Sequence, residues 1–291
     1  MSEPAYQMAC LEAASDTRAD ASAPAEDLPQ EARAFYRSVM ERLQEGGVPF
    51  LVAGAYALSQ YTGVVRHTKD FDVFIMPEDV DRALELLAAA GYEVERFSPH
   101  WLAKATCGDN FVDLIYNSGN GATPLDQRWF DHARTGNVLG VEGLICPPEE
   151  MIWSKAFLME RERYDGADVA HLLRSCSPTL DWARLLERFG THWRVLLGHL
   201  VLFGFIYPDR RHTVPRWVME DLGDRLMQDL DRVPVASHTC WGTLLSRVQY
   251  QVDLEELGYR DGRLEPKGNM SREDIELWRQ RAEEDAADGH H

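Results

Sequence analysis

The sequence has few basic residues and no long apolar run, and each shortage narrows what the protein can be. It carries 30 basic against 48 acidic side chains, which gives a net charge of −18. Such a chain is repelled at long range by a phosphate backbone or an anionic leaflet, so we expect no general DNA binding and no membrane binding. The longest apolar stretch, 195–208, is interrupted by His199 and is shorter than the ~20 residues that a membrane-spanning helix needs.

Cysteine is also scarce. The five cysteines are scattered, odd in number, and contain no CxxC pair. This pattern favours a reducing compartment over a disulfide framework or a zinc ribbon. The N-terminal residues lack the basic and apolar regions of a secretory leader, and their acidity is atypical of a mitochondrial presequence. We therefore expect a cytoplasmic protein.

Hydrophobic residues make up 45% of the chain, enough for one large domain or two small ones. Residues 1–28 and 262–291 have few large apolar side chains, so we expect two polar tails, the second with a polar helix at 272–287. Between the tails we expect an α/β core at 29–147 and a helical domain at 148–261.

The two halves differ in hydrophobic periodicity. In the first half we predict helices at 30–44, 55–61 and 78–90, and strands at 50–53, 70–75, 92–97, 101–106 and 111–116. In the second half we predict only helices, at 148–163, 165–174, 180–189, 192–205 and 215–230. The fold class is therefore α/β followed by an all-helical region.

Three aspartates lie in strands, where carboxylates are unfavourable. Asp70 and Asp72 are two residues apart and so share one face of their strand. Asp113 lies in another strand that is otherwise rich in apolar residues. Hard oxygen ligands held together favour Mg²⁺ or Mn²⁺. The alternatives are that Asp70 and Asp72 are solvated residues at a strand end, and that Asp113 forms a salt bridge with Arg66 or Lys104.

A glycine turn precedes these aspartates. The apolar run 50–53 ends at Gly54, and a short helix follows. Backbone N–H groups at a helix N-terminus bind phosphate, and glycine allows the ligand to approach closely. The alternative is an ordinary tight turn.

Together these residues resemble the DNA polymerase beta-like nucleotidyltransferase superfamily, whose pattern is hG[G/S], then Dh[D/E]h, then a later strand carboxylate. The matching residues are Val52-Ala53-Gly54-Ala55, Asp70-Phe71-Asp72-Val73 and Asp113. The resemblance implies a mixed sheet flanked by helices, with Gly54 and Ala55 at the nucleotide. Ala55 departs from the pattern, because the family prefers Gly or Ser there, so any phosphate contact at Ala55 would use the backbone alone.

A second feature is similar to small predicted nucleotidyltransferases and abortive-infection type toxins, in which a helical lysine precedes an R…D..D pattern. Here Lys155 is followed by Arg161, Arg163, Asp165 and Asp168. The resemblance implies that Lys155 touches the phosphates or the base. Lys155 could equally be a surface lysine, and Asp165 with Asp168 could form a helix N-cap with an acidic first turn.

The resemblance also implies roles for the strand aspartates. Asp70 and Asp72 would hold the metal of the nucleoside triphosphate, and with Asp113 they would hold a second metal at the acceptor hydroxyl, whose proton Asp113 would take. Arg66 and Lys69 would neutralise phosphate charge, or else be solvated.

The predicted function is Mg²⁺- or Mn²⁺-dependent transfer of a nucleoside monophosphate, from an NTP such as ATP, to an unidentified small-molecule, protein or RNA acceptor. Pyrophosphate is the second product. Two alternatives remain at this point: a catalytically silent nucleotide-binding or regulatory protein of the same fold, favoured by Ala55, and a DxD glycosyltransferase. The latter explains neither the glycine turn nor Asp113.

Overall fold

The computed structural model describes residues 28–65, 70–232, 238–264 and 270–287, with side chains described as far as residue 280. The chain divides into two compact units. The first, here the sheet unit, comprises residues up to Gly119 together with Pro124–Pro147. The second, here the helical unit, comprises Asn120–Thr123 and the residues from Pro148 onward. The predicted tail at 1–28 lies almost entirely outside the described residues.

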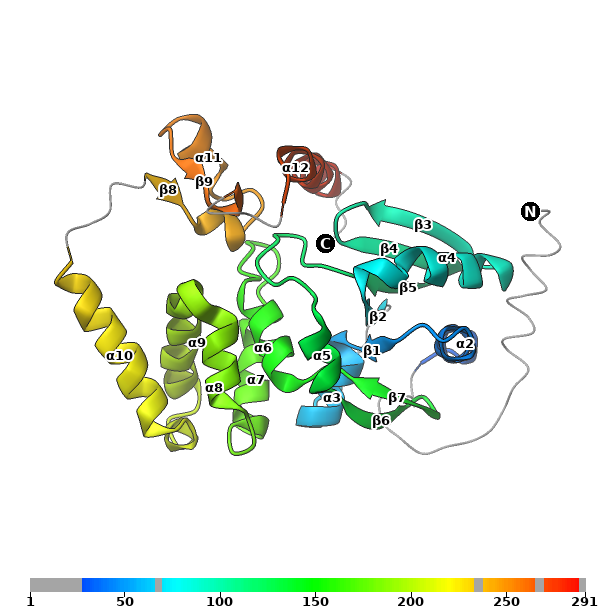
Figure 1. Ribbon diagram of the computed structural model, residues 1–291, viewed down its shortest axis with the longest axis horizontal. Coiled ribbons are helices and arrows are strands. Elements are labelled where there is room, and N and C mark those ends of the chain that lie inside the picture. The colour runs from blue at the N-terminus through cyan, green and yellow to red at the C-terminus, as the bar shows by residue number, and fades with distance from the viewer. Residues whose placement is uncertain (1–27, 66–69, 233–237, 265–269, 288–291) are drawn as a thin grey trace. The chain divides into compact units, whose positions relative to one another are not determined.

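The sheet unit contains a seven-stranded mixed sheet in the order β3-β4-β5-β2-β1-β7-β6 (Figure 1). The strands are β1 Phe50–Val52, β2 Asp70–Ile75, β3 Glu93–Ser98, β4 Leu102–Cys107, β5 Asn110–Ile115, β6 Arg134–Val138 and β7 Val141–Ile145. β2 pairs with β5 in parallel, while β1–β2 and β4–β5 are antiparallel. This mixed pairing brings β2, which carries two aspartates, to the middle of the sheet.

Apolar side chains cover one face of the sheet. The helices of the sheet unit are α2 Gln30–Glu45, α3 Gly54–Thr62, α4 Val80–Ala89 and α5 Gln127–Asp131, with the 3-10 turn η2 at Pro77–Asp79. The ring of Tyr36 in α2 stacks on Phe71 with centroids 5.0 Å apart. On the opposite face, Phe74 contacts Trp129 of α5 edge to face. Alternation along β2 therefore places Asp70 and Asp72 on the Phe74 face, away from the Phe71 core.

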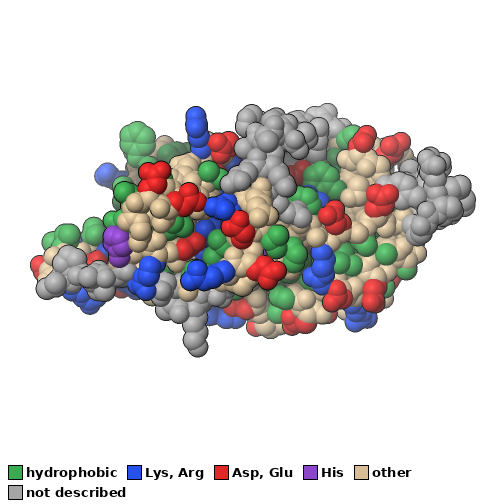
Figure 2. Space-filling model, turned by 90° about the horizontal axis from the view of Figure 1, so that it is seen from above, with side chains coloured by type: hydrophobic (Ala, Val, Ile, Leu, Met, Phe, Trp, Pro, Cys, Tyr) green, Lys and Arg blue, Asp and Glu red, His purple; other side chains and the backbone are tan. Residues whose placement is uncertain are grey.

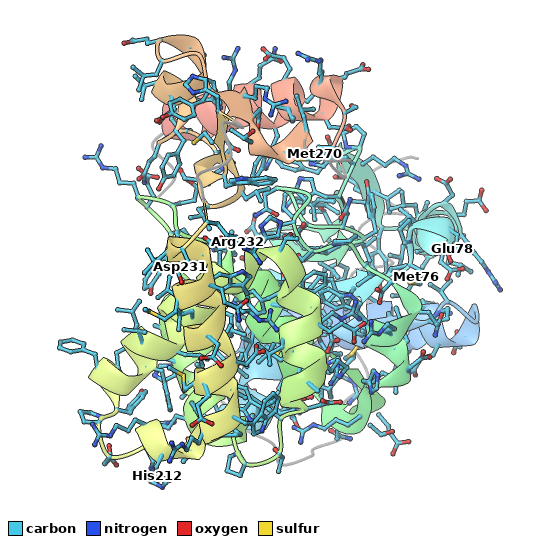
Figure 3. All side chains as sticks on the ribbon, turned by 60° about the vertical axis from the view of Figure 1, so that its left-hand side comes forward. Met76, Glu78, His212, Asp231, Arg232 and Met270 are labelled. Carbon is cyan, nitrogen blue, oxygen red and sulfur yellow. The ribbon has the colours of Figure 1, made fainter. Side chains whose placement is uncertain are left out.

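The described residues of the helical unit are mainly helical. The helices are α6 Pro148–Ala156, α7 Gly166–Cys176, α8 Trp182–Phe189, α9 Trp193–Ile206, α10 Arg216–Leu230, α11 Gln251–Glu255 and α12 Arg272–Ala287. A small parallel pair, β8 Thr239–Cys240 and β9 Arg260–Asp261, completes it. Figure 3 shows α10 between His212, in the preceding turn, and Asp231-Arg232 at its end.

One stretch of the helical unit, Trp182–Ile206, is apolar and long enough to cross a membrane by length and composition, with 33% of its most apolar window buried. The 3-10 turn Gly190–His192 divides this stretch into α8 and α9. Each helix buries one face, with Leu185 and Phe189 inside from α8 and Leu196 and Phe203 from α9. The stretch thus forms two packed helices of the unit.

The fold class predicted from the sequence is confirmed: a mixed sheet flanked by helices, followed by a helical region. Several elements differ from expectation, among them α5, α11 and the strands β8 and β9, which were not predicted. The hairpin β6–β7 was not predicted, and β7 pairs in parallel with β1. The helix predicted at 148–163 ends at Ala156, because Glu160 accepts hydrogen bonds from Ser246 Oγ and the Arg247 backbone N–H, and Met159 pairs with Tyr164 in a β-bridge.

The C-terminal segment differs from the solvated tail expected at 262–291. Its helix, α12, spans the predicted residues, but Trp278 in that helix is buried. Guanidinium groups of Arg247 and Arg263 lie 5.9 and 5.7 Å from the Trp278 ring centroid. Arg263 is itself buried and forms an ion pair with Asp261 at 2.7 Å. Cation–π contacts and this ion pair thus hold a segment whose composition is polar.

Candidate active site

The turn between β1 and α3 carries Gly54 in a left-handed conformation with φ +55°. A Cβ at this position would come within 2.8 Å of Asp72 Cγ and would overlap the carboxylate oxygen Oδ2. The preceding residue, Ala53, donates its backbone N–H to the Asp72 carbonyl at 2.9 Å. Glycine is therefore required at position 54 by conformation and by space, because the Asp72 carboxylate lies against the turn.

The N-terminus of α3 begins at this turn. Its N-cap residue, Ala53, makes no side-chain hydrogen bond to the helix. The first N–H groups of the helix, which include those of Gly54 and Ala55, have no partner within the helix, and they form the positive end of the helix dipole. This is the backbone arrangement that binds phosphate oxygens, and it adjoins the carboxylate of Asp72.

The three aspartates lie on one face of the sheet. Asp72 and Asp113 are register partners on the parallel strands β2 and β5, and Asp70 is two residues before Asp72. Asp70 is exposed, whereas Asp72 and Asp113 are half-buried. Burial and the negative charges of all three raise the pKa of Tyr36 to about 12. Tyr36 was not singled out from the sequence, because only the fold places α2 near these carboxylates.

Asp113 has a cationic neighbour. Lys104 on β4 is its register partner across the antiparallel pair, and Lys104 Nζ lies 2.8 Å from Asp113 Oδ1. This is one of the two salt bridges considered for Asp113 from the sequence. Within the described ranges, no group of three or more His, Cys, Asp or Glu side chains is arranged to hold a metal ion.

The carboxylates nevertheless suit one divalent cation. Mg²⁺ in nucleotide enzymes is commonly bound by one or two carboxylates together with phosphate oxygens of the substrate. Asp70 and Asp72 supply hard oxygen donors of this kind from one strand, beside the phosphate-binding turn. The donor set thus fits a cation that arrives with the nucleotide, whereas Asp113 is already paired with Lys104.

Lys155 lies in the helical unit and is largely enclosed. Its Nζ is 2.8 Å from Asp165 Oδ2 and 2.8 Å from Asp168 Oδ2. Burial by itself would lower the pKa of Lys155, but the two carboxylates outweigh burial and raise it. The surface-lysine alternative is therefore wrong, because Lys155 is the centre of a buried ion triad. Its proposed contact with nucleotide remains a prediction.

Asp165 stands at the N-cap position of α7, as the sequence suggested, but its side chain makes no capping hydrogen bond. It binds Lys155 and also accepts from Arg163 Nε at 3.1 Å. Burial by itself would raise the pKa of Asp165, and the two cations reverse this and lower it. The capping alternative for Asp165 is thus replaced by ion pairing.

Two of the predicted nucleotide contacts, Arg66 and Lys69, lie outside the described residues. Their expected role beside the phosphates stays a prediction. The described part of the chain resumes at Asp70, the first residue of β2.

Comparison with protein families decides the class of this chain. A family described as uncharacterised nucleotidyltransferase matches residues 25–196, well over half of the sequence. The chain belongs to this nucleotidyltransferase family. The match extends from α2 to α9 and includes the Gly54 turn, the three strand aspartates and the Lys155 triad. It sets aside the glycosyltransferase alternative.

Solved structures of the antibiotic-resistance factor ANT(2'')-Ia are similar at a greater distance. The solution structure aligns with a TM-score of 0.39 and 16% identity over 58% of this chain and 94% of that one. The crystal structure in complex with adenylyl-2''-tobramycin aligns with a TM-score of 0.34 and 14% identity over 67% of this chain and 98% of that one. No curated protein matches this nucleotidyltransferase. Likenesses this distant carry no argument about its substrates.

Proposed function

We propose that this nucleotidyltransferase transfers a nucleoside monophosphate from a metal-bound NTP, with ATP the first donor to test, to a hydroxyl group of a small molecule. The observation that carries the proposal is the contact between the Gly54 turn and the Asp72 carboxylate. In this contact a helix N-terminus, of the kind that binds phosphate, lies beside a carboxylate, of the kind that binds metal. A triphosphate with its cation requires both groups at one point.

The residues at this point divide the work. The backbone N–H groups of Gly54 and Ala55 would donate to oxygens of the β- and γ-phosphates. Asp70 and Asp72 would hold one divalent cation, which when bound neutralises the triphosphate and the departing pyrophosphate. These groups would fix the α-phosphorus for attack from the side of Asp113.

Asp113 would serve the acceptor. The acceptor oxygen forms a bond to the α-phosphorus while the bond from that phosphorus to the α,β-bridging oxygen breaks. The bridging oxygen keeps the electron pair and leaves as pyrophosphate. The hydroxyl proton passes to the carboxylate of Asp113, which lies in register with Asp72.

The acceptor class follows from charge. A chain with net charge −18 repels a polyanion such as RNA at long range, whereas it attracts cationic molecules and does not repel neutral ones. Acidic and basic side chains are interspersed on the face that Figure 2 shows, and no continuous basic track crosses the described part of that face. We therefore propose a neutral or cationic small molecule that carries a hydroxyl group.

Label transfer tests this function. The full chain is incubated with each α-³²P-labelled NTP, Mg²⁺ or Mn²⁺, and panels of neutral and cationic hydroxyl compounds. Asp72→Asn should reduce transfer by about 10²- to 10³-fold, because it removes a charge that stabilises the reacting phosphate. The matched control is Asp109→Asn, an exposed turn aspartate in the same unit, which should not change transfer.

Two results would contradict the proposal. Transfer that is equal in the wild type and Asp72→Asn would place the activity elsewhere. Nucleotide binding that depends on Asp72, without transfer to any acceptor or to water, would favour the catalytically silent alternative.

A further inference from the structure

Lys104 lies on the same face of the sheet as the three strand aspartates. On β4 it pairs in register with Asp113 of β5, and Asp113 pairs in register with Asp72 of β2. Register partners on adjacent strands project from the same face of a sheet. These side chains therefore form a row, Lys104, Asp113, Asp72, across three neighbouring strands, and it ends at the Gly54 turn.

The Lys104 ammonium is held from several sides. Its Nζ lies 2.8 Å from Asp113 Oδ1, and the two side chains are 23% and 16% exposed. The same Nζ lies 4.2 Å from the ring centroid of Phe111 and 5.0 Å from that of Phe97. Both rings favour a cation at this position. The positive charge beside Asp113 is thus a fixed part of the sheet.

A fixed cation limits what else Asp113 can bind. A mechanism with two metal ions needs Asp113 to hold a second divalent cation beside the acceptor hydroxyl. That ion would lie next to the ammonium and would be repelled by it. Lys104 thus supplies a positive charge to Asp113, and one divalent cation would serve the other two aspartates.

We propose that Lys104 takes the place of a second metal ion in this enzyme. It is a positioning residue: its ammonium neutralises and orients Asp113, and the site binds one divalent cation, at Asp70 and Asp72. The inference rests on the proposed function, because it assumes that these aspartates receive a metal-bound NTP.

Counting bound Mn²⁺ tests the inference without relying on activity. The full chain is dialysed to equilibrium with Mn²⁺ and α,β-methylene-ATP at equal concentrations on both sides, and the excess Mn²⁺ on the protein side is measured. The wild type should bind one ion per chain. Lys104→Gln should bind two, because Asp113 loses its cation, and Lys104→Arg should restore one. Lys104→Met repeats the test if the Gln variant fails to fold.

Kinetics supply a second readout. The rate of the wild type should depend on the first power of Mn²⁺ concentration, and that of Lys104→Gln on a higher power. The kcat of Lys104→Gln should fall about 10- to 100-fold, as for other residues that orient a ligand side chain, with little change in KM for the nucleotide. Lys104→Arg should restore both the wild-type dependence of the rate on Mn²⁺ concentration and the wild-type kcat.

The outcomes separate the two proposals. Two ions on the wild type, or one ion on both Lys104→Gln and Lys104→Met, would overturn the inference and leave the proposed function standing. No Mn²⁺ bound to the wild type, or binding unchanged in Asp72→Asn, would overturn the proposed function and the inference with it.

Discussion

The sheet unit and the helical unit differ in where they keep charge. The acidic and basic side chains that are fully buried in the described ranges all belong to the helical unit; they are Glu149, Glu150, Asp168, Arg184 and Arg263. Each is paired with an opposite charge. In the sheet unit the three strand aspartates, Asp70, Asp72 and Asp113, are exposed or half-buried.

This difference separates structural charges from functional ones. A buried carboxylate that is paired inside its own unit has no electrostatic demand left for a ligand. Carboxylates that adjoin one another at a partly open face retain an excess of negative charge, which favours a cation. The charges of the helical unit thus hold its helices together, whereas the carboxylates of the sheet unit are the ones proposed to bind a ligand.

The two units also differ in how many large apolar side chains they expose. Among the described large apolar side chains that are exposed, only Val65 belongs to the sheet unit, and the others lie in the helical unit. Phe205 and Leu230 are two of the most exposed. The helical unit therefore buries paired charges beside its apolar core and also exposes several large apolar side chains.

The largest effect on stability is expected from the buried charge cluster of the helical unit. Glu150 accepts hydrogen bonds from Arg184 Nη1 at 2.5 and 2.6 Å and from Arg188 Nε at 3.1 Å. Glu150→Ala leaves both guanidinium groups without this partner, so the free energy of unfolding should fall by about 3–5 kcal/mol in urea titration. The exposed Asp224→Ala in the same unit should change it by less than ~0.5 kcal/mol. If both variants lost the same free energy of unfolding, buried and exposed charges would not differ in their contribution to stability.

A slightly smaller loss in the free energy of unfolding is expected when Lys155 is replaced. Lys155→Met leaves Asp165 and Asp168 facing each other, which should cost about 3 kcal/mol near neutral pH. Because the folded pKa of Asp165 is lowered, its share of this stability is present above the unfolded pKa and is lost as pH falls through the folded value. The raised pKa of Lys155 keeps the lysine charged throughout that range.

Thermal unfolding of the wild type and Lys155→Met between neutral pH and about pH 3 checks this expectation. The difference in Tm between the wild type and Lys155→Met should become smaller as the pH falls. If stability is unchanged while KM for the NTP rises, Lys155 is a nucleotide contact and not a structural charge.

Two glycines of the sheet unit provide a matched pair with moderate effects. Gly54 and Gly63 both have positive φ, at +55° and +67°, but only Gly54 faces a neighbour that a Cβ would strike. Gly63→Ala should cost about 1–2 kcal/mol of backbone strain and leave nucleotide binding intact. Gly54→Ala should cost more and should also abolish NTP binding, since it displaces Asp72. Isothermal titration with α,β-methylene-ATP compares the two, and equal affinity would refute the role of the Gly54 turn.

The smallest effect is expected on the apolar surface of α9. Phe205 is 81% exposed, so Phe205→Ala should change the free energy of unfolding by less than ~0.5 kcal/mol. Phe203 in the same helix is 1% exposed, and Phe203→Ala should cost about 3–5 kcal/mol. A large loss at Phe205 would show that this surface is covered in solution.

Most single elements were predictable because their signals are local. β2 begins and ends at the predicted residues, since its β-branched and aromatic residues all lie within six positions. The helix at 272–287 was predicted in the same way. The hairpin β6–β7 was missed because its residues have a weak pattern, including Gly136 and Gly143 as a cross-strand pair. Its stability comes from pairing with β1, which is far away in the chain.

The sequence by itself determined which residue types carry the chemistry: a glycine before a helix and three carboxylates in strands, because spacing and composition are local properties. Only the tertiary structure decided between the partners left open for those residues. Strand register put Lys104 beside Asp113, and helix packing enclosed Lys155 between two aspartates. Electrostatic partners depend on distances of a few ångströms between segments that are remote in sequence, and only folding sets such distances.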